Sequence, residues 1–108
     1  MTRLVSAEEA RADLYRRAIL AWGIDAQMDV MYEEIGELLT AIGHMKRGRA
    51  TVRDVAGEIA DVHIMLGQLA MILDCAAAVD ERTAEKLARL ESRLDADDSR
   101  KARRDEPL

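Results

Sequence analysis

Aromatic residues and cysteines are scarce in this sequence. It contains no phenylalanine, one tryptophan and two tyrosines, and its apolar content comes mainly from Ala, Leu, Ile, Val and Met. Small and unbranched residues of this kind favour closely packed helices. The single cysteine, Cys75, excludes a disulfide bond within the chain and fits a reducing compartment.

Targeting and membrane signals are also missing. The first residues show no charged segment followed by an apolar stretch, as a secretory signal would. No apolar run looks long enough to span a bilayer. These two absences lead us to expect a cytoplasmic protein with no membrane partner.

Positive charge is in the minority. The 108 residues carry 16 Lys and Arg against 21 Asp and Glu, which gives a formal net charge of −5. Proteins that bind duplex nucleic acid normally present a basic face, so the balance argues against that class of partner. The negative net charge does not exclude a nucleotide ligand that binds through a metal ion. A chain this short is one domain with a thin core, because only about two-thirds of its unfolded surface is hidden on folding.

The apolar spacing predicts helices throughout, with no strand pattern. Ser6 and Glu9 form a capping-box signature, and the helix that they open should run to about Ala21 and end at Gly23. Asp25 can cap a second helix. The buried stripe of this second helix is expected to comprise Met28, Met31, Ile35, Leu38, Leu39 and Ile42.

A basic loop over residues 46–50 separates the second helix from a third. Thr51 and Asp54 make another cap, and the third helix carries the stripe Val55, Ile59, Val62, Leu66 and Leu69. We expect a break over Ala76–Asp80, a fourth helix from about Glu81 to Leu94, and fraying over the charged stretch from Asp95 to Leu108. The sequence thus predicts an all-α domain over residues 1–94 and a flexible tail over 95–108.

Two short acidic motifs stand out on the second and third helices. They are Glu33-Glu34-Ile35-Gly36-Glu37 and Glu58-Ile59-Ala60-Asp61. Residues i and i+3 are neighbours on a helix surface, so each motif provides one forked pair of carboxylates. If the two helices pack face to face, four carboxylates converge and repel one another without a cation. Hard divalent cations prefer oxygen ligands of this type, and magnesium usually shares its shell with substrate phosphates.

The two acidic motifs also fit structures without a metal site. The carboxylates could be ordinary surface acids on two solvated helix faces, or the chain could be a non-catalytic helical oligomerisation module. A di-iron bundle would need Glu-x-x-His on inward faces, and neither His44 nor His63 follows a Glu at that spacing. His63 lies about 200° around the helix from Asp61, so it is a poor ligand for this cluster. His44, near the end of a helix, suits the helix dipole.

The two motifs together carry a family resemblance. The pattern Glu-Glu-x-x-Glu, a gap of a couple of dozen residues and then Glu-x-x-Asp resembles the MazG-like branch of the all-α nucleoside triphosphate pyrophosphatases. The segments 22–27, 58–66 and 86–90 are also similar to that family, and the resemblance covers roughly residues 15 to 94. Phosphoribosyl-ATP pyrophosphatase shares the same expected fold, and no feature of the sequence singles it out.

The resemblance implies hydrolysis of a nucleoside triphosphate to a nucleoside monophosphate and pyrophosphate, in a nucleotide-pool house-cleaning role. It implies magnesium, with manganese as the alternative ion, and it assigns the metal to Glu34, Glu37, Glu58 and Asp61. Glu33 and Glu37 are the candidate catalytic residues, although Glu33 could equally make a structural ion pair. The candidate substrate contacts, each with an ordinary structural interpretation beside it, are Trp22, Gln27, Lys46, Lys86 and Arg89.

Assembly is the last expectation. Helices two and three carry apolar residues on more than one side, including Leu39, Ile64 and Met71, and a single chain would leave some of them exposed. The resemblance implies a four-helix MazG-like bundle completed by oligomerisation, as a dimer or a tetramer. We therefore expect a homo-oligomer with these two helices at the interface.

Overall fold

The computed structural model describes residues 4–105, and within them the chain is all-helical. Four helices follow one another: α1 (Ala7–Trp22), α2 (Ile24–Lys46), α3 (Val52–Ile72) and α4 (Ala76–Arg104). The described residues contain no strand, which confirms the expected all-α class. The chain divides after Cys75 into two units, the first holding α1 to α3 and the second holding α4.

Local signals in the sequence set most helix ends. Ser6 accepts a hydrogen bond from the Glu9 N–H at 3.1 Å, Thr51 accepts one from the Asp54 N–H at 3.1 Å, and both capping boxes are complete. Gly23, with φ of 90°, separates α1 from α2, as expected. The expected cap at Asp25 is wrong, because Gly23 is the N-cap and Asp25 lies inside the first turn of α2.

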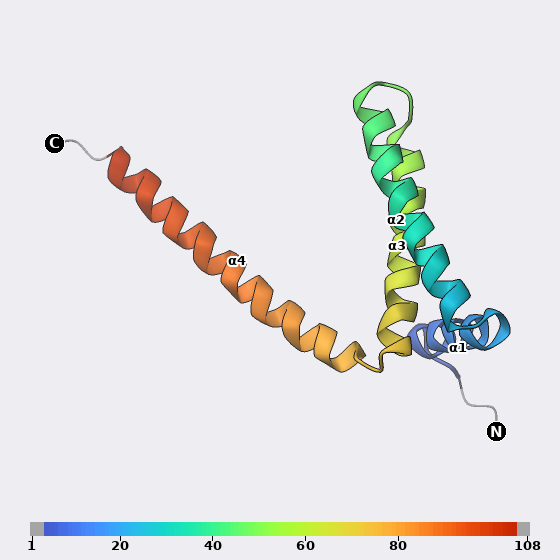
Figure 1. Cartoon of the computed structure of the whole chain (residues 1–108). Coiled ribbons are helices and arrows are strands. Elements are labelled where there is room, and N and C mark those ends of the chain that lie inside the picture. The colour runs from blue at the N-terminus through green and yellow to red at the C-terminus, as the bar shows by residue number, and fades with distance from the viewer. Residues whose placement is uncertain (1–3, 106–108) are drawn as a thin grey trace. The chain divides into compact units, whose positions relative to one another are not determined.

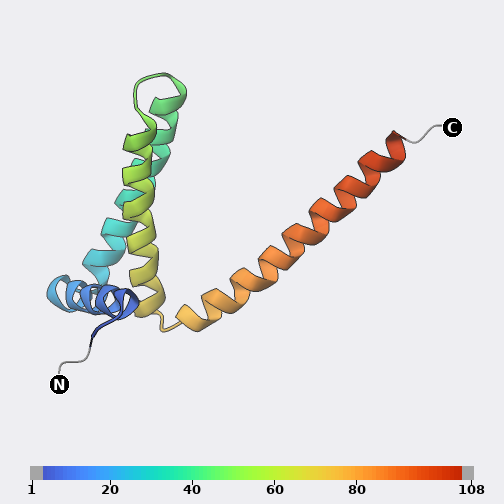
Figure 2. The ribbon, with the colours of Figure 1, turned by 180° about the vertical axis from the view of Figure 1, so that it is seen from behind.

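Helices α2 and α3 form an antiparallel hairpin, and α1 lies across the end of it that holds the start of α2 and the end of α3 (Figures 1 and 2). The close approach of α1 depends on a glycine, because a Cβ on Gly67 of α3 would lie 2.5 Å from the Tyr15 ring. The loop after α2 turns at Gly48, where φ is 73°. This hairpin brings the two acidic motifs side by side.

The core of the first unit is small. Its buried apolar residues are Met31, Val55 and Met65, with Gln27 and Gln68 buried beside them. The prediction of a buried stripe is wrong at three positions, because the side chains of Leu39, Ile59 and Leu66 are exposed. Both helices have the apolar face that the spacing predicts, but packing within the hairpin buries only part of each face.

Helix α4 differs from the sequence prediction at both ends. It begins at Ala76, so the break expected over Ala76–Asp80 is wrong, and the connection to α3 consists of residues 73–75. It also continues through Asp95 to Arg104, which is most of the stretch that we expected to fray, and residues 106–108 of that stretch lie outside the described residues. Alanines at its start and alternating charges near its end, such as the Asp97–Lys101 ion pair at 3.2 Å, suit a helix.

Helix α3 is long and apolar enough, by length and composition alone, to cross a membrane. It has 21 residues, and its most apolar window has a mean hydropathy of 1.3, which differs from our expectation that no segment reaches that level. The core helix of a water-soluble protein can have the same length and hydropathy, so these two properties alone do not assign α3 to a membrane. The acidic residues Glu58 and Asp61 lie in the middle of this helix.

Candidate metal and phosphate site

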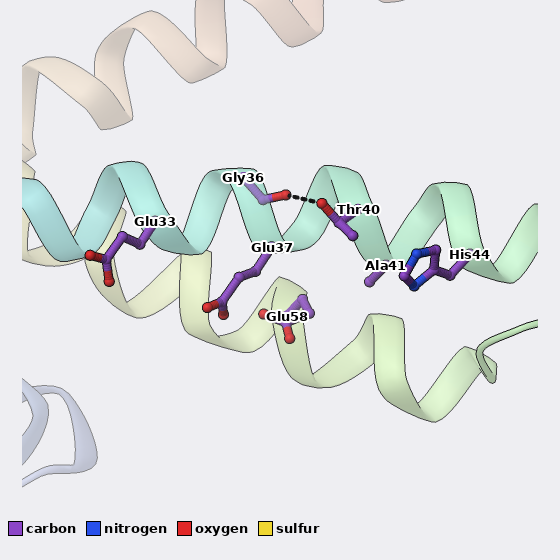
Figure 3. Close-up of a pocket in the computed structure, with 7 residues that line it drawn as sticks. All are labelled: Glu33, Gly36, Glu37, Thr40, Ala41, His44 and Glu58. Atoms are coloured by element: carbon purple, nitrogen blue, oxygen red, sulfur yellow. Dashed lines mark hydrogen bonds between the residues drawn. The ribbon is translucent and has the colours of Figure 1, made fainter.

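Three carboxylates meet where α2 and α3 run side by side. Glu34 and Glu37 on α2 and Glu58 on α3 each offer an oxygen, and these oxygens lie within 4.8 Å of one another. The i, i+3 spacing puts the first two on one side of α2, and the antiparallel hairpin supplies the third. Figure 3 shows the Glu37 and Glu58 carboxylates close together between the two helices. The structure thus joins the two sequence motifs in one cluster.

The cluster is short of positive charge. Burial, followed by the neighbouring charges of Glu37 and Asp61, raises the pKa of Glu34 from 4.5 to about 7. The same causes raise the pKa of Glu58. One carboxylate oxygen of Glu34 and one of Glu58 are buried without a hydrogen-bond partner among the described residues. Buried, unpartnered carboxylate oxygens that repel one another are a donor set that suits a hard divalent cation.

Asp61 and Glu33 lie at the edges of this cluster. Asp61 is exposed, one turn along α3 from Glu58, and its charge raises the pKa of both Glu34 and Glu58. Glu33 is exposed on α2, and its side chain lies one turn before Glu37 (Figure 3). It follows that Asp61 acts on the cluster through its charge, whereas Glu33 faces the space beside it.

That space is an open groove of about 530 Å³ along α2. It is lined by Glu33, Gly36, Glu37, Thr40, Ala41 and His44 of α2 and by Glu58 of α3. Gly36 has nothing within 4 Å of the place where a Cβ would lie, and the Thr40 hydroxyl donates to the Gly36 carbonyl at 3.0 Å. The small side chains of the floor leave room for a ligand to approach the helix beside the carboxylates.

Four of the groove residues were missed by the sequence analysis. These are Gly36, Thr40, Ala41 and His44. With Glu33 and Glu37 they occupy positions i, i+3, i+4, i+7, i+8 and i+11, which is a single face of a helix. The signal was therefore present in the spacing, although His44 had been assigned only to the helix dipole.

The residues expected to contact substrate are divided between the two units. Trp22 is 68% exposed at the end of α1 and borders a separate hollow with Ile24. Gln27 is buried and donates to Gln68, and Lys46 is the exposed last residue of α2. Lys86 and Arg89 belong to α4, in the second unit. Of the three that belong to the first unit, none lines the groove beside the carboxylates in the described part of the chain.

No family model, curated protein or solved structure matches this chain. The resemblance to the MazG-like family therefore rests on the two acidic motifs and the segments around them. The candidate site rests on the positions of the carboxylates.

Proposed function

We propose that this protein is a metal-dependent nucleoside triphosphate pyrophosphohydrolase that releases a nucleoside monophosphate and pyrophosphate. The observation that carries the proposal is the cluster of Glu34, Glu37 and Glu58, two of which have buried oxygens without partners. The sequence resemblance supplies the reaction class. The groove beside the cluster supplies space for a phosphate chain.

Magnesium is the proposed ion, with manganese as the alternative. Glu34, Glu37 and Glu58 would hold it, and Asp61 adds negative charge from the next turn of α3. A bound divalent cation would offset the charge of the triphosphate and lower the pKa of a water molecule. The raised pKa of Glu34 fits this assignment, because a carboxylate that resists ionisation alone gains most from a cation.

The remaining groove residues would orient the substrate and move a proton. Glu33 and Glu37 both line the groove, so either carboxylate can accept a proton from an attacking water. Gly36 and Ala41 have small side chains, which leave space in the groove. His44 lies two turns along α2 from Glu37. The groove therefore has an acidic end for the metal and an open end for the rest of the substrate.

A non-catalytic oligomerisation module is the second candidate, and the exposed apolar residues favour it. Leu39, Ile59 and Leu66 are 66%, 53% and 47% exposed. Such residues suit an interface, and a metal site formed between helices is compatible with one. We propose a cytoplasmic homo-oligomer, a dimer or a tetramer, that uses α2 and α3 as its interface. A particle of 12.1 kDa in light scattering at micromolar concentration would contradict this assembly.

One experiment separates the candidates. The full chain is incubated with a panel of nucleoside and deoxynucleoside triphosphates and with phosphoribosyl-ATP, in magnesium, in manganese and in EDTA. The proposal expects monophosphate and pyrophosphate in equal amounts, only when the metal is present. Release of orthophosphate would overturn the proposed bond cleavage. Folded, oligomeric protein with no activity on any substrate would leave the oligomerisation module as the function.

A further inference from the structure

Helix α4 carries an apolar stripe, and α4 is the only helix of the second unit, so no other helix of that unit packs against the stripe in the described residues. Leu87, Leu90 and Leu94 are 60%, 51% and 55% exposed, and Val79 near the start of the helix is 47% exposed. Helix α4 is one continuous helix (Figure 2). The leucines are spaced by three and then four residues, so the spacing places them in one narrow line along this helix. This spacing is the a and d pattern of a two-stranded coiled coil, with Thr83 at the preceding d position.

The residues on the two sides of this stripe differ in charge. With Leu87 and Leu94 at a and Leu90 at d, the g positions are Val79, Lys86, Arg93 and Arg100. The e positions are Ala84, Glu91, Asp98 and Asp105. Every charged g residue is basic and every charged e residue is acidic. The ion pairs within α4 join Arg82 to Glu85 and Asp97 to Lys101, so in the described chain they leave these flanking charges free.

We propose that α4 pairs with the α4 of a second copy of this chain as a parallel, two-stranded coiled coil. In a parallel pair each g residue faces the e residue five positions later on the other helix. Lys86 then faces Glu91 and Arg93 faces Asp98, while Val79 faces Ala84. An antiparallel pair would instead set g against g and e against e, which brings like charges together. The charge pattern therefore selects both the partner and the direction.

Polar residues in the stripe fix the register. Asp80 and Lys101 occupy a positions and Asp97 occupies a d position, so the apolar contact is confined to the segment from Thr83 to Leu94. A shift of one heptad would place Leu90 of one helix beside Asp97 of the other. Because a single polar residue in such a stripe is enough to specify alignment, the in-register pair is favoured. This inference is independent of the proposed enzymatic function.

Cysteine cross-linking of the full chain tests direction and register. Cys75 is first replaced in a Cys75→Ser chain, and Thr83→Cys then places one thiol at a d position. In the proposed pair the two thiols face each other, and mild oxidation should link most chains into a covalent dimer. Ser92→Cys, which lies at the outward f position, is the matched control and should link little. Leu94→Cys is a second probe at an a position. Absence of cross-linking at both seam positions, in chains with unchanged helical circular dichroism, would overturn the proposal.

Charge reversal in the Cys75→Ser, Thr83→Cys chain tests the flanking pairs. Arg93→Glu and Asp98→Arg should each lower the cross-linked fraction about threefold, because each change sets like charges opposite one another twice in the dimer. The double variant should recover the original fraction. Residues 93 and 98 are five apart, so they are not neighbours on one helix and recovery must come from pairing between helices. Arg103→Glu, at an outward c position, is the control. Single variants without effect, or a double variant without recovery, would contradict the parallel pairing.

Discussion

Gln27 on α2 donates a hydrogen bond from its Nε2 to the Oε1 of Gln68 on α3 over 2.6 Å, and both side chains are buried. The two amides lie next to Met31 and Met65, so each is the polar partner of the other in an otherwise apolar contact. A buried amide without its partner is expensive. The pair therefore helps to fix how α2 and α3 lie along each other, and with them the carboxylates of the cluster.

The first prediction concerns this amide pair. Gln27→Met or Gln68→Met alone should lower the free energy of unfolding by about 1–3 kcal/mol, because the remaining amide is buried unpaired. The double variant should lose much less than the sum of the two, since methionine has a similar shape. Urea unfolding of the four chains gives the coupling, and strictly additive losses would contradict the pairing. If KM rose in Gln27→Met but not in Gln68→Met, Gln27 would be a substrate contact, as the sequence resemblance implied.

The second prediction concerns the packing of α1. Gly67→Ala should lower the free energy of unfolding by about 1–3 kcal/mol, because the new methyl overlaps the Tyr15 ring and α1 must move. Gly57→Ala is the matched control on the same helix. Nothing lies within 4 Å of its added methyl, so it should raise stability by about 0.5–1 kcal/mol. Thermal unfolding compares them, and equal effects at the two glycines would rule out the close contact.

The third prediction concerns the carboxylate cluster. Glu37→Gln should reduce pyrophosphate release by more than about 100-fold, because it removes a proposed metal ligand, and Asp61→Asn should reduce it by about 10–100-fold, because Asp61 supports the site through its charge. The helices should remain folded, and the melting temperature without metal should rise because one repelling charge is gone. The magnesium-induced rise in melting temperature should shrink. Asp13→Asn, which changes an exposed acid on α1, is the control. Near-normal turnover in either cluster variant would remove that carboxylate from the site.

The fourth prediction follows from the raised pKa of Glu34. The native pKa is about 7 and the ordinary value is 4.5, so between these values the folded protein binds more protons than the unfolded one. Stability in EDTA should therefore fall as the pH rises through this window and then level off. Magnesium should reduce the fall, and Glu34→Gln should make it smaller, with the remaining fall due to Glu58, whose pKa is also raised. The measurement is the urea midpoint across the window, and a curve that rose with pH would contradict the assigned environment of Glu34.

Much of the local structure was already determined by the sequence. The capping boxes at Ser6 and Thr51 and the glycine between the first two helices were predicted correctly, because these signals act within a few residues. The two acidic motifs also follow from local spacing, which places their carboxylates on single helix faces.

Only the tertiary structure decided which side chains are buried and which residues of α2 and α3 contact each other. Helical spacing gives the apolar arc of α2 and α3 but not the rotation of one helix against the other, so only the structure shows that Met65 is buried while Ile59 and Leu66 are exposed. The same rotation pairs Gln27 with Gln68 and buries an oxygen of Glu34. These contacts join residues far apart in the chain, and their energies depend on interhelical packing, which no local pattern encodes.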